Sequence, residues 1–229
     1  MSNAQASESG LDVVHLEISG RAHLSTDLVK SLDDGLSQTE DIGESGLLVV
    51  RVVGGEEPAA SYHWPGQANI EMVNKWERAV RRMERTASTT LVVAEGNCSG
   101  LALELLLVAD RRLARSNLRI QIAAPIWPGM GIYRLVHQIG YARSRKLMLS
   151  GAELQAELAR EFDIIDDITD SDLEAVTRVN LRELAAIDDF AVRRRLLQDG
   201  LSSSFDEAIG AHLAACDRTL RRDGNRRDR

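Results

Sequence analysis

Cysteine is scarce in this chain of 229 residues, which contains only Cys98 and Cys216. These two cysteines are far apart in the sequence and form no CxxC pair, so neither a disulfide framework nor a zinc site is indicated. We therefore expect no metal site and a reducing, cytoplasmic environment.

The sequence also lacks long apolar segments and an excess of positive charge. No apolar run reaches the roughly 18 to 20 residues that a membrane-spanning helix needs, and the polar opening MSNAQASESG has no hydrophobic signal core. The 28 lysines and arginines are outnumbered by 35 aspartates and glutamates, which gives a formal net charge of -7. Binding to a phosphate backbone requires a basic surface. We expect no membrane and no nucleic-acid partner, and favour a protein or a small molecule.

Hydrophobic residues, in contrast, make up 44% of the chain, which is enough for one substantial core. The alternation in DVVHLEIS predicts a half-buried strand. A helix is predicted next, with Ser25 or Thr26 as its cap. Its core-facing leucines follow at helical spacing: Leu24, Leu28, Leu32 and Leu36.

Strand and helix patterns then alternate along the chain. GLLVVRVVGG, TTLVVAEG, LRIQIA and FDIIDDI predict strands, and IYRLVHQIG, ARSRKLMLSG and AELQAELAREF predict helices that stop at Gly140 and Gly151. IEMVNKWERAVRRMER predicts a helix with one apolar face, formed by Ile70, Val73, Trp76, Val80 and Met83. Such alternation favours an α/β fold.

From Ser171 onward only helical patterns occur. We therefore divide the chain into a disordered N-terminus (1–10), an α/β core (11–170), a helical C-terminal region (171–222) and a charged, solvated tail (223–229).

The stretch LVVAEGNCSGLALELLLVAD runs from a strand through Ser99 and Gly100 into a helix that starts near Leu101 and has Glu104 as its early charge. A helix N-terminus presents unpaired N–H groups and the positive end of a dipole. This arrangement suits a developing negative charge, such as an enolate oxygen formed from a thioester. Gly100 would let a substrate approach the backbone.

Two motifs in this sequence resemble the crotonase, or enoyl-CoA hydratase/isomerase, superfamily. The first motif keeps Gly96, Gly100, Glu104 and Asp110. The second keeps Pro128, Gly129, Gly131, Arg134, Leu135, Gly140, Ser150 and Gly151. The resemblance implies a crotonase-like (ClpP/crotonase) spiral of strand-strand-helix units, whose helical C-terminal region assembles a homotrimer or a hexamer.

The same resemblance implies a site for a coenzyme A thioester, with coenzyme A as part of the substrate and no separately bound cofactor. The enolate would lie between two backbone N–H groups. One donor falls at Leu101, beside Gly100, and the other at Tyr62 or His63. Four further residues are expected to contact the substrate: Trp64, Trp127, Pro128 and Gly129.

The acids depart from the family pattern. Hydratases of this superfamily use two glutamates, and Glu104 matches the first, but IQIAAPIWPG contains no carboxylate where the second is expected. Acid/base work by paired carboxylates needs both groups, so ordinary enoyl-CoA hydration is not expected. Among trimmed crotonases, the chain resembles the accessory crotonase of dihydroxyphenylacetyl-CoA formation in bacterial glycopeptide-antibiotic pathways. That type of protein assists a type III polyketide synthase in dehydration or aromatisation.

Two classes of function remain open. One is a thioester enzyme with Glu104 as its acid/base, and the other is a catalytically reduced partner that binds or braces a synthase. Glu104 could also be a structural carboxylate paired with an arginine such as Arg134, because a buried charge must be compensated.

Other residues have two readings as well. Cys98 precedes a helix N-terminus, where a thiolate nucleophile could form, but a packed, inert thiol is favoured. His63 could act as a base or line an acyl pocket, or its aromatic loop could be a lid. Glu56 and Glu57 could replace the missing acid or form an exposed acidic loop. The tail arginines alternate with aspartates, which favours a solvated end over a coenzyme A phosphate site.

Overall fold

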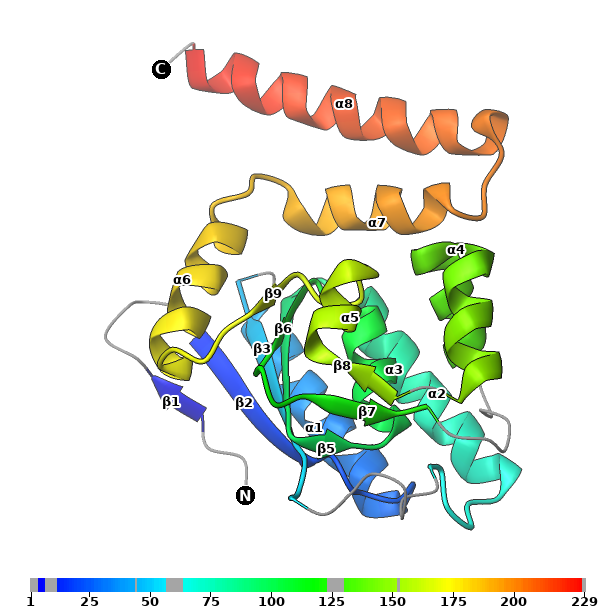
Figure 1. Cartoon of the computed structure of the whole chain (residues 1–229). Coiled ribbons are helices and arrows are strands. Elements are labelled where there is room, and N and C mark those ends of the chain that lie inside the picture. Colours follow the sequence, from blue (N-terminus) through cyan, green and yellow to red (C-terminus); the bar gives the residue numbers. More distant parts are fainter. Residues whose placement is uncertain are drawn as a thin grey trace. The chain divides into compact units, whose positions relative to one another are not determined.

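The computed structural model describes residues 4–6, 12–43, 45–56, 64–122, 130–151 and 153–227. The chain forms two compact units, Met1–Leu184 and Ala185–Arg229. The first unit contains the two sheets labelled in Figure 1.

The larger sheet has six strands in the order β1 (Ala4–Ala6), β2 (Asp12–Ser19), β3 (Leu47–Val53), β4 (Thr89–Glu95), β6 (Arg111–Ala114) and β9 (Asp167–Ile168). Strands β2 to β9 of this sheet pair in parallel, and β1 is antiparallel to β2. A smaller sheet joins β5 (Asn97–Cys98), β7 (Arg119–Gln121) and β8 (Glu153–Gln155). Because β2, β3 and β4 are parallel, the loops that follow them meet at one edge of the larger sheet.

The helices of the first unit are α1 (Thr26–Ile42), α2 (Ile70–Arg85), α3 (Gly100–Val108), α4 (Gly131–Ser150), α5 (Ala156–Glu161) and α6 (Leu173–Ala185). Helix α1 begins as predicted, because the Ser25 side chain accepts a hydrogen bond from the Leu28 N–H at 3.2 Å. Its predicted core-facing leucines are all buried: Leu24, Leu28, Leu32 and Leu36.

Both faces of the larger sheet are covered. On β3, Leu48 and Val50 belong to the larger apolar cluster, which includes side chains of α1, α2 and α3. The alternate residues Leu47 and Val49 belong to a second cluster with Leu181 of α6. Burial on both faces explains why β3 and β4 are continuous apolar runs instead of alternating ones.

Two glycines end helical segments as the sequence indicated. Gly140 breaks α4 with φ 77° and ψ 163°, and Gly151 caps it with φ 62°. The prediction of one helix over AELQAELAREF was wrong, because Leu154 lies in β8 and pairs with Ile120 of β7 before α5 begins. Pairing with a distant strand overrides the local helical preference here.

Three further expectations differ from the structure. Part of the opening segment, expected to be disordered, forms β1 and pairs with β2. Ile70 was assigned to the buried face of α2 but is 73% exposed at the first position of that helix. Strand β6 was not predicted at all, because its four residues include Arg111 and Arg112 and give no apolar pattern.

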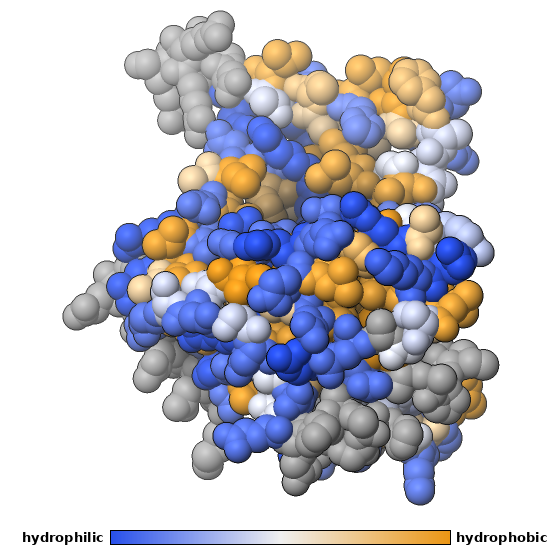
Figure 2. All heavy atoms as spheres, viewed as in Figure 1, coloured by the Kyte–Doolittle hydropathy of each residue, from blue (hydrophilic) through white to orange (hydrophobic). Residues whose placement is uncertain are grey.

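The second unit consists of α7 (Phe190–Gly200) and α8 (Phe205–Arg227). Arg222 of α8 donates two hydrogen bonds of 2.7 Å to the Asp189 carboxylate, which precedes α7. Helix α8 extends to Arg227, into the segment expected to be a solvated tail. Large apolar side chains are exposed on this unit, as Figure 2 shows: Leu197, Leu201, Phe205, Ile209, Leu213 and Leu220. Within the described residues, no helix has the length and apolar character needed to cross a bilayer.

Candidate active site

Helix α3 is buried at every position, and Glu104 is its one charged residue. The Glu104 side chain is 1% exposed, and its Oε2 accepts a hydrogen bond from the indole N–H of Trp76 on α2. No other acidic residue is buried among those that the structure describes. Because a carboxyl group removed from water must be hydrogen-bonded or neutralised, the contact with α2 is part of what lets Glu104 lie in this helix.

Two backbone N–H groups at the amino end of α3 have no acceptor among the residues that the structure describes. The Ser99 N–H donates to the Gly20 carbonyl at 2.8 Å and the Ala102 N–H to the Ser99 carbonyl at 3.1 Å. The described part of the chain provides no acceptor for the N–H groups of Gly100 and Leu101, and both residues are buried. Unpaired buried N–H groups are rare in native proteins, and a helix N-terminus favours negative charge. This position can therefore hold a ligand oxygen that develops negative charge.

The hydroxyl of Ser99 leaves these donors available. An N-cap serine ordinarily accepts a hydrogen bond from the second or third N–H of its helix. The Ser99 side chain is 3% exposed, makes no such bond to α3 and has no partner among the described residues. The first turn of α3 therefore keeps both its backbone donors and an adjacent unpaired hydroxyl.

Glycines hold the loop before α3 close to the ends of the neighbouring strands. A Cβ atom on Gly54 would lie 2.5 Å from the backbone nitrogen of Asn97, and one on Gly20 would lie 2.5 Å from Cys98 Sγ. No side chain fits at either position without movement of the backbone or of Cys98. The close approach of the ends of β2, β3 and β4 thus fixes where α3 begins.

Cys98 is a packed thiol, as favoured from the sequence. The residue is 1% exposed, and its Sγ donates to the Glu95 carbonyl at 3.2 Å. Burial, with a smaller contribution from the nearby Glu95 charge, raises the pKa of the Cys98 thiol to about 12. The thiol is therefore protonated near neutral pH, which disfavours a thiolate nucleophile.

Trp64, predicted to contact substrate, packs against the partner of Glu104. The rings of Trp64 and Trp76 meet edge to face with their centroids 5.7 Å apart and an interplanar angle of 73°. Trp64 is 9% exposed. Glu104, Trp76 and Trp64 thus form a contiguous buried row of polar and aromatic groups between α3 and the loop before α2.

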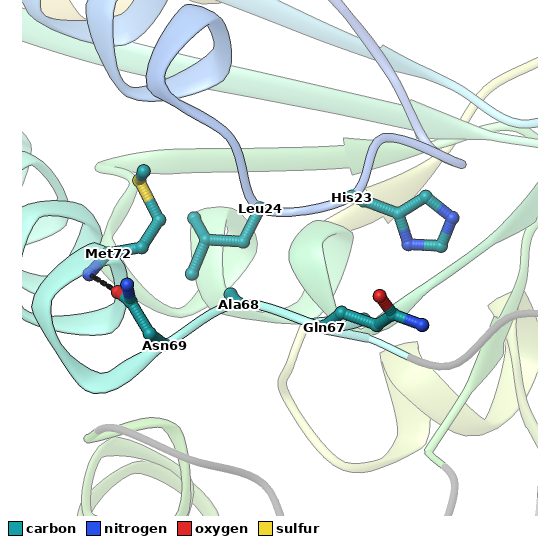
Figure 3. Close-up of a pocket in the computed structure, with 7 residues that line it drawn as sticks. His23, Leu24, Gln67, Ala68, Asn69 and Met72 are labelled. Carbon is teal, nitrogen blue, oxygen red and sulfur yellow. Dashed lines mark hydrogen bonds between the residues drawn. The ribbon is translucent and has the colours of Figure 1, made fainter.

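A cavity of about 730 Å³ lies between the segment that follows β2 and the segment that leads into α2, and its volume is within the usual range of small-molecule sites. Figure 3 shows its lining, with His23 and Gln67 at one end and the apolar side chains of Leu24 and Met72 at the other. The Asn69 side chain accepts a hydrogen bond from the Met72 N–H at 2.9 Å and so caps α2. Glu104 is not among the described residues that line this cavity.

None of the residues that line this cavity was predicted from the sequence as a site residue. His23 follows the carboxyl end of β2, and residues 66–69 lead into α2. Their position in the fold is the feature that indicates a binding role, because ligands in open α/β sheets bind beyond the carboxyl ends of the parallel strands. No residue pattern distinguished them from an ordinary connecting loop.

Arg134 does not pair with Glu104, the alternative considered from the sequence. Its guanidinium group instead donates to Glu77 at 2.5 Å and to Glu84 at 3.3 Å, both on α2. Burial alone would lower the pKa of Arg134, but the two carboxylates outweigh it and the pKa lies above its usual value. Arg134 therefore joins α4 to α2.

Five predicted site residues lie outside the described part of the chain: Tyr62, His63, Trp127, Pro128 and Gly129. Glu57, considered as a replacement acid, also lies outside it, whereas Glu56 is exposed. The residues that the structure does describe include no cluster of side chains suited to hold a metal ion.

Comparison with curated proteins gives one relative that spans nearly the whole chain. A protein of Amycolatopsis orientalis named enoyl-CoA-hydratase is 39% identical over 214 residues, covering 91% of this chain and 96% of that protein. The 2,3-dehydroadipyl-CoA hydratase of Escherichia coli strain K12 is 29% identical over 96 residues, covering 40% of this chain and 38% of that enzyme. No protein-family profile matches the chain.

Solved structures share the fold at low sequence identity. An enoyl-CoA hydratase of Shewanella pealeana superposes with a TM-score of 0.74 and 16% identity, covering 91% of this chain and 84% of that one. An enoyl-CoA hydratase/isomerase of Marinobacter aquaeolei gives a TM-score of 0.73 and 17% identity, covering 91% and 88%. These neighbours confirm the predicted fold class, with its parallel sheet and helical C-terminal region.

Proposed function

The chain belongs to the crotonase, or enoyl-CoA hydratase/isomerase, superfamily, and from that premise we propose that it stabilises a thioester enolate at the amino end of α3. The substrate is a coenzyme A thioester. The observation that carries this proposal is that the N–H groups of the buried residues Gly100 and Leu101 have no acceptor among the described residues. Donors fixed in place before charge develops, in a site without water, stabilise an oxyanion more than water does.

Glu104 is the proposed acid/base of this site. It lies one helical turn after Gly100, and a helix places residues at such spacing on the same face. Its carboxyl group is held by Trp76 on one oxygen. Proton transfer to or from a substrate carbon requires a group of this kind within hydrogen-bond reach. The proposal requires that the bound thioester comes within hydrogen-bond reach of Glu104, which is buried in this structure.

The reaction we propose is dehydration or aromatisation of a coenzyme A-bound intermediate during dihydroxyphenylacetyl-CoA formation, with a type III polyketide synthase as partner. Support comes from the resemblance to trimmed crotonases and from the acids. Glu104 is the one buried carboxyl group among the described residues, whereas hydration of an enoyl thioester by this superfamily uses two. The free thiols of Cys98 and Cys216 fit a reducing cytoplasm.

The test uses Glu104→Gln, which keeps the shape of the side chain and removes its titration. Dihydroxyphenylacetyl-CoA formation is followed with the synthase supplied. We expect product formation to fall by roughly two to four orders of magnitude, while a nonreactive thioester analogue binds to the variant and the parent alike in calorimetry. Glu161→Gln, at an exposed position outside the site, is the matched control and should behave as the parent does.

A second candidate is a catalytically reduced partner that binds or braces the synthase. Two observations favour it: Trp76 occupies one oxygen of Glu104, and Glu104 does not line the cavity of Figure 3. In the same assay this function predicts that Glu104→Gln enhances the synthase as well as the parent does. Rapid hydration of crotonyl-CoA by the parent would contradict both candidates.

We also propose that the protein is a homotrimer or a hexamer. The exposed apolar residues of α7 and α8 support assembly, because a monomer that leaves Leu197, Leu201 and Phe205 in water forgoes their burial. Multi-angle light scattering at working concentration should give three or six times 25.2 kDa. A monomer mass would contradict the proposal.

A further inference from the structure

A second hollow lies between α1 and the carboxyl-terminal half of α2, away from the candidate active site. It has a volume of about 290 Å³, and its lining is dominated by arginine: Glu40, Arg78, Arg81, Arg82, Arg85 and Thr86. We call it the basic groove. Thr86 lies just before the start of β4, whereas the loop before α3 follows the end of β4. The basic groove and the amino end of α3 are therefore at opposite edges of the sheet.

The four arginines of the groove are not equally engaged. Arg82 donates to Glu40 at 2.6 Å, to the Ser37 hydroxyl at 3.0 Å and to Asp33 at 3.3 Å, so it is fixed against α1. In the described part of the chain, the guanidinium groups of Arg78, Arg81 and Arg85 make neither a hydrogen bond nor an ion pair, and all three residues are exposed. The guanidinium groups of Arg81 and Arg85 therefore face the hollow without a carboxylate of their own among the described residues, whereas the charge of Arg78 interacts with that of the exposed Glu71.

The charges on α2 are segregated in a way that helix stability does not explain. Of its three acids, Glu77 and Glu84 lie on the side that pairs with Arg134, and Glu71 in the first turn pairs with Lys75. The helix dipole favours basic residues in the last turn, which accounts for Arg82 and Arg85. Arg78 and Arg81 precede that turn, and like charges at helical spacing destabilise a helix. This concentration of positive charge occurs in a protein whose formal net charge is -7.

We propose that the basic groove binds a small phosphorylated anion. Guanidinium groups present a planar fork of donors that matches phosphate oxygens two at a time. The hollow, at about 290 Å³, is just below the roughly 300 to 1,000 Å³ found for drug-sized ligands, so it suits a phosphate or diphosphate group more than a whole cofactor. Arg82 forms a fixed floor, and Arg78, Arg81 and Arg85 close around the anion. The site does not depend on the proposed thioester chemistry.

The experiment measures binding of inorganic diphosphate to the full chain by isothermal titration calorimetry at low and moderate salt. We expect saturable binding that weakens with sodium chloride, because exposed charges are screened. The triple variant Arg78→Gln, Arg81→Gln, Arg85→Gln should bind about 10-fold more weakly or worse, since it removes three charge-assisted donors. Arg82 is left intact because it joins α1 to α2, and circular dichroism checks that the variant is folded.

The matched control has the same change in net charge at three other arginines, Arg178→Gln, Arg195→Gln and Arg221→Gln, whose ion pairs are single contacts within one helix. It should bind diphosphate as the parent does. Equal weakening in both triple variants, or no saturable binding to the parent, would overturn the proposal.

A second titration identifies the source of the phosphate. If coenzyme A competes with diphosphate, and the competition is lost in the groove variant, the phosphates of the coenzyme occupy the groove. If coenzyme A and diphosphate bind independently, the ligand is a separate phosphorylated molecule. Binding of an acidic peptide but not of diphosphate would replace the proposal with a protein-docking surface.

Discussion

Helices α2 and α3 meet at the hydrogen bond between Trp76 and Glu104, yet they relate to solvent in opposite ways. Helix α2 has a buried apolar side that includes Val73, Trp76 and Met83, and charged residues over the rest of its surface. Helix α3 is apolar all round and buried at each of its nine positions. The residue pattern of an amphipathic helix indicates which side faces the core. A helix that is apolar on all sides does not, so the surroundings of Glu104 could not be read from residues 100–108.

The largest expected effect contrasts a fully buried position of α3 with an exposed position of α2. Leu105→Ala in α3 removes a fully buried side chain and should lower the free energy of unfolding by about 2 to 5 kcal/mol. Ile70→Ala at the exposed start of α2 should change it by less than about 0.5 kcal/mol. Urea denaturation of both variants measures the difference. A similar loss of unfolding free energy in the two variants would mean that α3 is not packed on all sides.

The contact between the helices should give the next largest effect. Trp76→Phe keeps an aromatic ring against Trp64 but removes the N–H that Glu104 accepts, so we expect a loss of about 1 to 3 kcal/mol in the free energy of unfolding. Combining it with Glu104→Leu, which has no acceptor for that N–H, in a double-mutant cycle should cost measurably less than the sum of the single changes. Strict additivity would show that the hydrogen bond contributes nothing to stability.

The N-cap residues of the two helices should differ in how much they contribute to stability. Asn69 accepts a hydrogen bond from the Met72 N–H at the start of α2, so Asn69→Ala should destabilise the protein by about 1 kcal/mol. Ser99 makes no such bond at the start of α3, so Ser99→Ala should cost less than about 0.5 kcal/mol. Thermal unfolding by calorimetry ranks the pair. The reverse order would indicate that the Ser99 hydroxyl caps α3 after all.

The smallest effect concerns Cys98 beside α3. Because burial raises its pKa from the ordinary 9.0 to about 12, folding favours the protonated thiol. The resulting stability is fully present below pH 9 and is lost as pH rises from about 9 towards 12, so it should not change between pH 7 and 8. In that range iodoacetamide should label the exposed Cys216 well before Cys98, as mass spectrometry of native protein can show. Equal labelling rates would contradict the buried position of Cys98.

Local patterns predicted much of the fold. Ser25 as the cap of α1, the strand residues of β3 and β4, the break at Gly140 and the stop at Gly151 all followed from residue type and spacing. These features depend on a few neighbouring residues, so their physical cause is contained in the segment itself. Strand β8 was missed because its helical sequence is overridden by pairing with β7.

The same distinction between local and long-range causes applies to the candidate site. The motif around Gly100 and Glu104 indicated a carboxyl group within an apolar helix, and the structure buries Glu104 in α3. It did not reveal that Trp76, 28 residues away, bonds to Glu104, or that Trp64 packs on that indole. Nor did it reveal the cavity beside His23 and Gln67, because connecting loops carry no periodicity from which a lining could be inferred.

Residue type and spacing were enough to show which segments are apolar, where strands β2, β3, β4 and β7 and most helices lie, and that one carboxyl group enters an otherwise apolar helix. Tertiary structure alone decided the partners of the buried charges. It joined Arg134 to Glu77, 57 residues away along the chain, instead of to Glu104. Local periodicity records only whether a position faces water or the core. The identity of the neighbour across that core depends on how distant segments pack, because a buried charge takes the partner that the assembled fold brings within reach.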